Sequence, residues 1–200
     1  MASLQVKNNW LKKWYPWLLT TLSGVALTAS FWQAAERIHQ LKNPGLALSC
    51  NINPIVDCGG VMSHKLAALF GFPNTFIGMV MFSMLFMAGL ALILGVTFTQ
   101  KIRNVVMVLS KIALLFSLWF FWVSLYEIGK ICLFCLAIWP ASVALFWFGL
   151  QYWLEELEVR NTWQAKLHKL TSKLRFEPII TIYLVMFLLF LFSFRNYYFN

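Results

Sequence analysis

The sequence is poor in charged residues: only 12% of its 200 residues are Asp, Glu, Lys or Arg, while 60% are hydrophobic. That balance excludes a soluble domain of ordinary composition. The sequence also has no recognisable binding motif for haem, flavin or nicotinamide, no internal repeat and no low-complexity segment. The few chemically reactive side chains that are present must therefore carry any argument about function.

Long apolar runs are what the sequence has instead. A helix needs roughly 20 apolar residues to cross a bilayer core of about 30 Å. Five stretches qualify, at residues 16–35, 76–98, 105–126, 131–153 and 178–194. The first lacks a small-residue cleavage site, so we interpret it as a retained span and not as a signal peptide. The sequence thus predicts an all-α membrane protein with five transmembrane helices, in a single integral membrane domain over residues 1–200.

The cations are distributed unevenly between the two sides of this layout. A net charge of +9 could by itself suggest a nucleic-acid partner. However, five spans place alternate loops on opposite sides, and eleven of the sixteen Lys and Arg residues then fall on one side. Cytoplasmic loops carry such an excess. We therefore expect a cytoplasmic N-terminus, an extracytoplasmic C-terminus and external loop (36–75), contact with lipid, and no nucleic acid.

Four cysteines are the main candidates for chemistry, and they form two spaced pairs on the predicted extracytoplasmic side. Cys132 and Cys135 make a Cys-x-x-Cys motif where the fourth span begins. Cys50 and Cys58 lie in the external loop, and the seven residues between them are enough to close a disulfide loop. Disulfides form and persist on that side of a membrane. Topology and cysteine placement therefore agree.

The two pairs favour a redox relay. Thiol–disulfide exchange requires a thiolate that can touch the sulfur it attacks, and both pairs share one membrane face. Cys132 falls at a helix N-terminus, which stabilises a thiolate, and Cys135 lies one turn deeper, at lipid depth. A mobile quinone is the simplest acceptor that needs no dedicated motif. A zinc site, two structural disulfides and unreactive buried cysteines are the alternatives, although the Cys50–Cys58 spacing is wide for zinc and we predict no metal.

A further amphipathic segment follows the loop cysteines. Residues 61–70 alternate polar and apolar side chains with helical period, which predicts a short helix on the membrane surface. Its apolar face would cap a helix bundle from outside. Residues 71–74, Gly-Phe-Pro-Asn, then predict a turn into the second span.

Taken together, these residues resemble bacterial homologues of vitamin K epoxide reductase. The shared features are the Cys50-x7-Cys58 loop, the Ser63-His64 region, Phe70-Gly71-Phe72-Pro73-Asn74 leading to Gly78, and Tyr126 followed by Cys132-x-x-Cys135. Their order and spacing match from about Cys50 to Trp139, and the five-span layout covers nearly the whole chain. An unrelated quinone-coupled bacterial oxidase of similar size has its two cysteine pairs in the reverse order.

The resemblance implies a fold and a reaction. Four helices would surround a quinone (ubiquinone or menaquinone), with the surface helix as a lid, in a bacterial cytoplasmic membrane. A separate thioredoxin-fold protein would deliver electrons by attacking Cys58. Cys50 would then attack the second pair at Cys132, and Cys135 would reduce the quinone. The net reaction oxidises the partner's dithiol to a disulfide and yields quinol.

The resemblance also implies quinone contacts, at Asn74, Trp139, Ser63 and His64. The family often has Ser or Thr six residues after the second loop cysteine, where this chain has His64, with Ser63 one position earlier. Trp139 stands where the animal enzymes have Tyr. An indole cannot lose a proton as a phenol can, which weakens the alternative of a vitamin K quinone or epoxide reductase. A small transporter or assembly factor with structural disulfides is the rival from another class.

Overall fold

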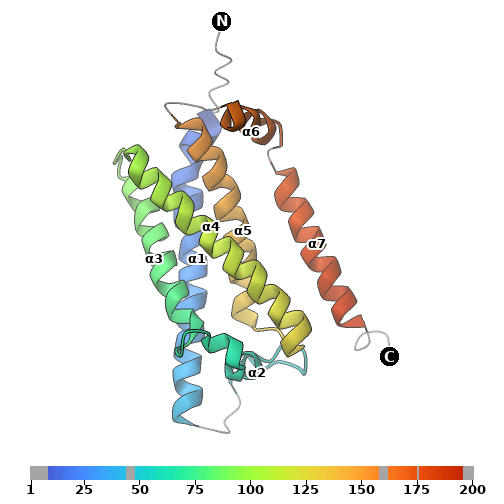
Figure 1. Cartoon of the computed structure of the whole chain (residues 1–200). Helices are drawn as coiled ribbons and strands as arrows, with labels where there is room; N and C mark the ends of the chain where they lie inside the picture. The colour runs from blue at the N-terminus through green and yellow to red at the C-terminus, as the bar shows by residue number, and fades with distance from the viewer. Residues whose placement is uncertain (1–8, 44–47, 158–161, 175, 196–200) are drawn as a thin grey trace, which may run out of the picture.

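The computed structural model describes residues 9–43, 48–157, 162–174 and 176–195, and it is built from helices. Four long helices pack into a bundle: α1 (Asn9–Lys42), α3 (Asn74–Ile93), α4 (Gln100–Val123) and α5 (Leu133–Glu155). α1 lies against both α3 and α5, and α4 packs on α5 (Figure 1). Within the described ranges the only β-pairings are two isolated bridges, so the predicted all-α class is confirmed.

The remaining elements lie around this bundle. At one end are α2 (Cys58–Ser63), the 3-10 helix η1 (Lys65–Ala68) and the π-helical turn η2 (Ser124–Ile128), which continues α4. Across the other end lies α6 (Thr162–Lys173), and α7 (Glu177–Ser193) stands to one side of the bundle (Figure 1). The Tyr183 hydroxyl of α7 donates to the Pro140 carbonyl oxygen of α5 at 2.7 Å.

Small residues let the central helices approach closely. A Cβ added at Gly89 of α3 would lie 2.8 Å from the backbone nitrogen of Thr20 on α1, so only glycine fits there. Leu19, Leu85 and Leu145 are fully buried nearby, in the apolar core of the half of the bundle that lies towards α6. A second apolar core surrounds the cysteines at the opposite end.

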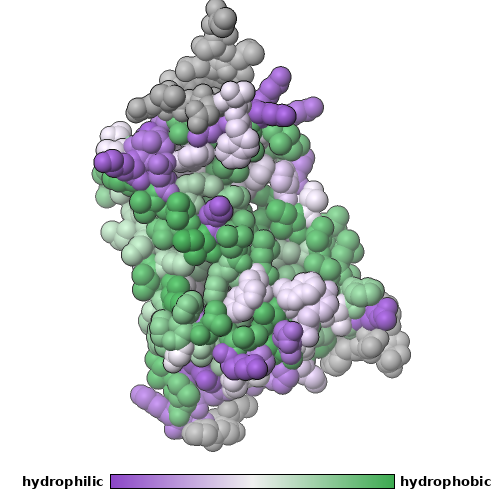
Figure 2. All heavy atoms as spheres, viewed as in Figure 1, coloured by the Kyte–Doolittle hydropathy of each residue, from purple (hydrophilic) through white to green (hydrophobic). Residues whose placement is uncertain are grey.

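Three helices of the described chain are long and apolar enough to cross a membrane: α3, α4 with its η2 extension, and α5. A fourth span results if α6 and α7, which meet at a bend of 75°, are counted as one. α1 is long enough, but Thr, Ser and Gln side chains dilute its apolar run. Figure 2 shows mostly apolar residues around the middle of the molecule and hydrophilic ones at both ends. The protein is thus a multi-pass membrane protein, while the number of five spans stays a prediction.

The predicted surface helix over residues 61–70 is wrong as a single element. The chain forms α2, which begins three residues earlier, and then η1, with a break at His64, whose backbone is extended (φ −69°, ψ 141°). Two caps explain the break. The Asp57 side chain accepts a hydrogen bond from the Gly60 amide at 2.9 Å and starts α2, and His64 Nδ1 accepts from the Leu66 amide at 3.3 Å and starts η1.

Only the first half of the predicted apolar face packs on the bundle. Val61 and Met62 are buried, whereas Leu69 and Phe70 are 48% and 61% exposed. The turn that follows has the predicted form, because Gly71 adopts a positive φ of 83°, which favours glycine.

Candidate redox site

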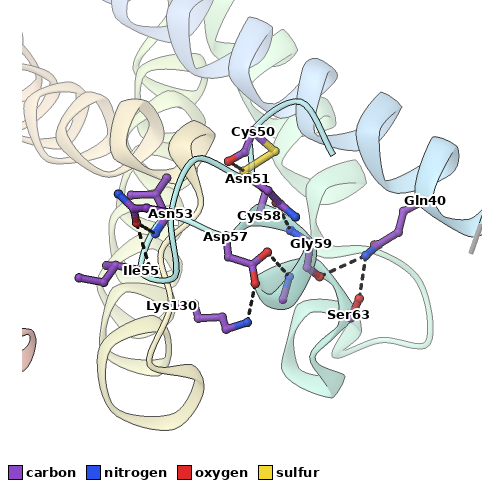
Figure 3. Close-up of polar contacts among 12 residues, drawn as sticks. Gln40, Cys50, Asn51, Asn53, Ile55, Asp57, Cys58, Gly59, Ser63 and Lys130 are labelled. Carbon is purple, nitrogen blue, oxygen red and sulfur yellow. Dashed lines mark hydrogen bonds and ion pairs between the residues drawn. A yellow bond between two sulfur atoms is a disulfide. The ribbon is translucent and has the colours of Figure 1, made fainter. Parts of the chain in front are cut away.

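The loop cysteines are joined. Cys50 and Cys58 form a disulfide with a Cα–Cα distance of 5.8 Å, and both residues are buried (Figure 3). The segment between them folds back at Asn53, whose side-chain oxygen accepts hydrogen bonds from the amides of Ile55 (2.9 Å) and Val56 (2.7 Å). This is an Asx turn, in which an Asn side chain replaces a backbone partner.

The second half of this loop pairs with the segment that precedes Cys132. Val56 and Ile131 form a parallel bridge. The Ile131 amide donates to the Ile55 carbonyl at 2.8 Å, and the Asp57 amide donates to the Ile131 carbonyl at 3.0 Å. Because the two segments run in the same direction, the residues just beyond the bridge, Cys58 and Cys132, emerge side by side.

A charged pair reinforces this bridge. Lys130 Nζ forms an ion pair with Asp57 Oδ2, drawn as a dashed line in Figure 3. Burial alone would raise the pKa of Asp57, but the hydrogen bond and positive charge of Lys130, together with the amides of Gly60 and Gly59, outweigh that effect and lower the pKa. A Cβ added at Gly60 would lie 2.7 Å from both Asp57 Oδ2 and Lys130 Cδ, so a larger residue there would force this pair to shift.

The second cysteine pair begins α5. Cys132 is the N-cap residue of that helix, Cys135 lies in its first turn, and both are buried free thiols. The Cys132 Sγ lies 3.3 Å from the Cys58 Sγ. This contact places Cys58 against Cys132, whereas the resemblance implies that Cys50 attacks Cys132.

Gln33 is a residue of this site that the sequence motifs do not indicate. Its side chain extends from α1, is 5% exposed, and its Nε2 lies 3.6 Å from Cys132 Sγ and 3.7 Å from Cys135 Sγ. One signal was available, since an amide inside an apolar run is costly unless it finds a partner. Nothing in the sequence indicates that the partners are the sulfurs, which lie about a hundred positions further along the chain.

An apolar cavity adjoins Cys135 inside the bundle. Gln33, Asn74 and Trp139 are among the residues that line it, and so are Thr75 of α3 and Phe116, Ser117 and Phe120 of α4. The Thr75 hydroxyl oxygen is buried and has no hydrogen-bond partner among the residues that the structure describes. A cavity with apolar walls and a few polar groups suits an aromatic ring that carries carbonyl oxygens, and the Thr75 hydroxyl offers an unused donor for such an oxygen.

The four predicted quinone contacts divide into two groups. Asn74 and Trp139 line the cavity. The Asn74 side chain also holds η1 in place: its Nδ2 donates to the Leu66 carbonyl (2.7 Å) and its Oδ1 accepts from the Leu69 amide (3.0 Å). Ser63 and His64 are not among the lining residues: the Ser63 hydroxyl accepts from Gln40 at 2.9 Å, and His64 caps η1.

A family model described as the vitamin K epoxide reductase family matches residues 17–150, two thirds of the chain. The matched range contains all four cysteines, Gln33 and the lining of the cavity. No curated protein matches the chain.

Proposed function

The chain belongs to the vitamin K epoxide reductase family of quinone- or epoxide-linked thiol oxidoreductases, and from that membership we propose that it is a quinone-dependent oxidase of protein dithiols. It would reoxidise a separate thioredoxin-fold protein and pass the electrons from the loop cysteines to the Cys-x-x-Cys pair and then to a quinone. The single observation that carries this proposal is the 3.3 Å contact between Cys58 Sγ and Cys132 Sγ, beside a cavity that Cys135 lines.

The internal exchange then has two balanced steps. The Cys58 thiolate of the reduced loop attacks Cys132 Sγ, forms a Cys58–Cys132 disulfide, and releases Cys135 as a thiolate. The Cys50 thiolate next attacks Cys58, restores the Cys50–Cys58 disulfide, and releases Cys132. Two electrons move from the loop to the inner pair. The observed combination of an oxidised loop and a reduced inner pair corresponds to the end of this exchange.

Cys50 is the sulfur that this arrangement leaves for the partner protein. Cys58 already faces Cys132, so the partner's thiolate would attack Cys50 and release Cys58 as the next nucleophile. Both loop cysteines are buried, so docking of the partner must displace the chain around Cys50. The partner has a thioredoxin fold in this proposal because such folds present a reactive Cys-x-x-Cys thiolate at their surface.

The last step of the proposed electron transfer, from the inner cysteine pair to the quinone, would take place in the cavity. Cys135 would give up two electrons together with Cys132, forming their disulfide, while the quinone gains two electrons and two protons and becomes quinol. Thr75 would donate to a ring oxygen, and Asn74 and Trp139 would contact the ring. Ubiquinone and menaquinone both fit this chemistry. We place the protein in a bacterial cytoplasmic membrane with five spans, the N-terminus inside, and the cysteines outside.

Quinol formation tests the proposal directly. Purified protein in lipid nanodiscs would receive a quinone and a reduced thioredoxin-fold oxidase, and quinol would be followed by its ultraviolet absorbance. Turnover that needs both substrates, and that is lost in Cys135→Ala, is the expected result. Failure with every such partner, combined with reduction of a vitamin K epoxide by dithiothreitol, would instead favour the epoxide reductase. Retention of function in all four Cys→Ala variants would favour a transporter or assembly factor.

A further inference from the structure

One buried amide touches both sulfurs of the inner pair. Gln33 Nε2 lies 3.6 Å from Cys132 Sγ and 3.7 Å from Cys135 Sγ, and it is the donor in both contacts. A primary amide nitrogen carries two N–H groups, so a single side chain can serve both sulfurs at once. The near equality of the two distances means that neither sulfur is favoured.

The choice of acceptors is informative. A neutral thiol is a weak hydrogen-bond acceptor, so a buried amide gains little from two thiols when backbone carbonyls are the usual partners of such groups. A thiolate is different, because hydrogen bonds to an ionised acceptor are roughly twice as strong as those between neutral groups. The position of Gln33 therefore has most effect when one of the two sulfurs is charged.

The start of α5 also favours a thiolate on its N-cap residue Cys132, but the charged and polar side chains around the pair do not duplicate the contact of Gln33 with both sulfurs. Arg37, one turn further along α1, lines the cavity, and its guanidinium donates to Gln40 at 2.6 Å. Lys130, in the segment before α5, is paired with Asp57, so their charges offset each other. α2 contributes Cys58, which is held in the loop disulfide, and α3 contributes Asn74 and Thr75, which are uncharged.

We propose that Gln33 is a catalytic residue that stabilises each thiolate of the relay in turn. When Cys58 attacks Cys132, the bond from Cys132 to Cys135 breaks and its electron pair stays on Cys135 Sγ. One Gln33 N–H then donates a hydrogen bond to this thiolate. When Cys50 then attacks Cys58, the Cys58–Cys132 bond breaks and the electron pair stays on Cys132 Sγ, within reach of the other N–H. This inference rests on the proposed function only for the direction of electron flow.

The reactivity of the inner thiols tests this role without quinone or partner protein. In a Cys50→Ala, Cys58→Ala background, only Cys132 and Cys135 react, and their alkylation by iodoacetamide would be measured from pH 5 to 10. Gln33→Met keeps the length of the side chain but removes both N–H groups. We expect alkylation at pH 7 to fall about tenfold, the effect of a one-unit rise in thiol pKa, and the whole profile to move to higher pH.

The matched control is Thr28→Val on the same helix. Thr28 is exposed and its hydroxyl donates to the Gly24 carbonyl within α1, away from the sulfurs. This variant should reproduce the parent profile. The reduction potential of the inner pair, measured in glutathione buffers, should become more negative in Gln33→Met only, because the reduced form loses its donor. A profile and a potential in Gln33→Met equal to those of the parent would overturn the proposal.

A measurement on the unmutated chain covers the case in which Gln33→Met fails to fold. Infrared difference spectra between the oxidised and reduced inner pair would be recorded with and without ¹⁵N in the glutamine side chains. A glutamine band that shifts on reduction supports the proposal, and an unchanged one contradicts it. Absence of quinol formation by the unmutated protein would count against the proposed function, while these readouts would still decide the role of Gln33.

Discussion

The two ends of the helix bundle are built from similar contacts but differ in what those contacts connect. At the end covered by α6, Lys12 of α1 pairs with Glu156, and Trp153 Nε1 donates to Asn104 Oδ1 at 2.7 Å. At the end that carries the cysteines, an ion pair and two backbone hydrogen bonds join the loop to the segment before α5. The first set ties helix ends together, whereas the second aligns two sulfurs.

The difference shows that position, and not strength, decides the importance of a polar contact. Ion pairs at a protein surface typically contribute about 0 to 1 kcal/mol to stability. Asp57 and Lys130 lie 73 positions apart in the sequence, and each is within two residues of a cysteine. Loss of that pair therefore changes the distance between reacting atoms, while loss of the pair at the other end changes only helix packing.

Removal of Cys135 is expected to give the largest effect. Without Cys135, Cys132 can attack Cys58 but cannot form the inner disulfide, so quinol formation should fall to background and a Cys58–Cys132 disulfide should accumulate. Peptide mapping under non-reducing conditions would detect it. Cys132→Ala should lose activity equally but show no such cross-link. A predominant Cys50–Cys132 cross-link would mean that the observed contact is not the one used for exchange.

Gly60→Ala is expected to rank second. The added methyl group would lie 2.7 Å from the side-chain ends of Asp57 and Lys130, so these side chains must shift, which disturbs both their ion pair and the Asp57 cap of α2. We expect the exchange between loop and inner pair to slow about tenfold or more, as measured by stopped-flow mixing with a reduced partner and quenching with acid. Gly149→Ala is the control, because a Cβ there would make only ordinary contacts, at 3.6 Å from Tyr15, and should leave the rate unchanged.

Asp57→Asn should have a smaller effect, about threefold to tenfold on the same rate, because the backbone bridge remains when the charge is lost. The pKa of Asp57 is lowered, so the ion pair is complete at neutral pH and is lost only as the pH falls below the ordinary range of an aspartate. The rate of the unmutated protein should therefore show no step from Asp57 between pH 5 and 8. A step in that range that disappears in Asp57→Asn would contradict this assignment.

The smallest effect is expected at the opposite end. Glu156→Gln removes the partner of Lys12, a pair whose side chains are partly exposed to solvent. Unfolding in denaturant should change by less than about 1 kcal/mol, and quinol formation should be unaffected. A loss of turnover comparable to that of Asp57→Asn would remove the distinction between the two ends.

Much of the fold could be predicted from the sequence because it follows from uninterrupted apolar runs. α3, α4 and α5 coincide closely with predicted spans, since few polar groups interrupt them. The first predicted span covers residues 16–35, whereas α1 runs from Asn9 to Lys42, and Gln40 in its last turns donates to the Gly59 carbonyl of α2. The break at His64 depends on competition between the caps of two short helices, which helical periodicity does not represent.

The site was less predictable than the fold. The cysteines were identifiable by residue type and spacing, and the resemblance indicated Asn74 and Trp139, which do line the cavity. The Val56–Ile131 bridge depends on how two distant segments meet, so the sequence could not indicate that Cys58 faces Cys132. Gln33 could not be predicted from the sequence for the same reason, because its role depends on sulfurs that approach it only in the folded chain.

The 3.3 Å separation of Cys58 and Cys132 has a consequence for the pace of turnover. Sulfurs that already touch need no excursion of the loop, so the internal exchange should be insensitive to the viscosity of its surroundings. In the proposed function, the slow steps of each cycle would then be the arrival of the soluble partner protein and the lateral diffusion of the quinone through lipid. A more viscous bilayer should lower the turnover rate by slowing diffusion of the quinone, even though the sulfur chemistry is unchanged.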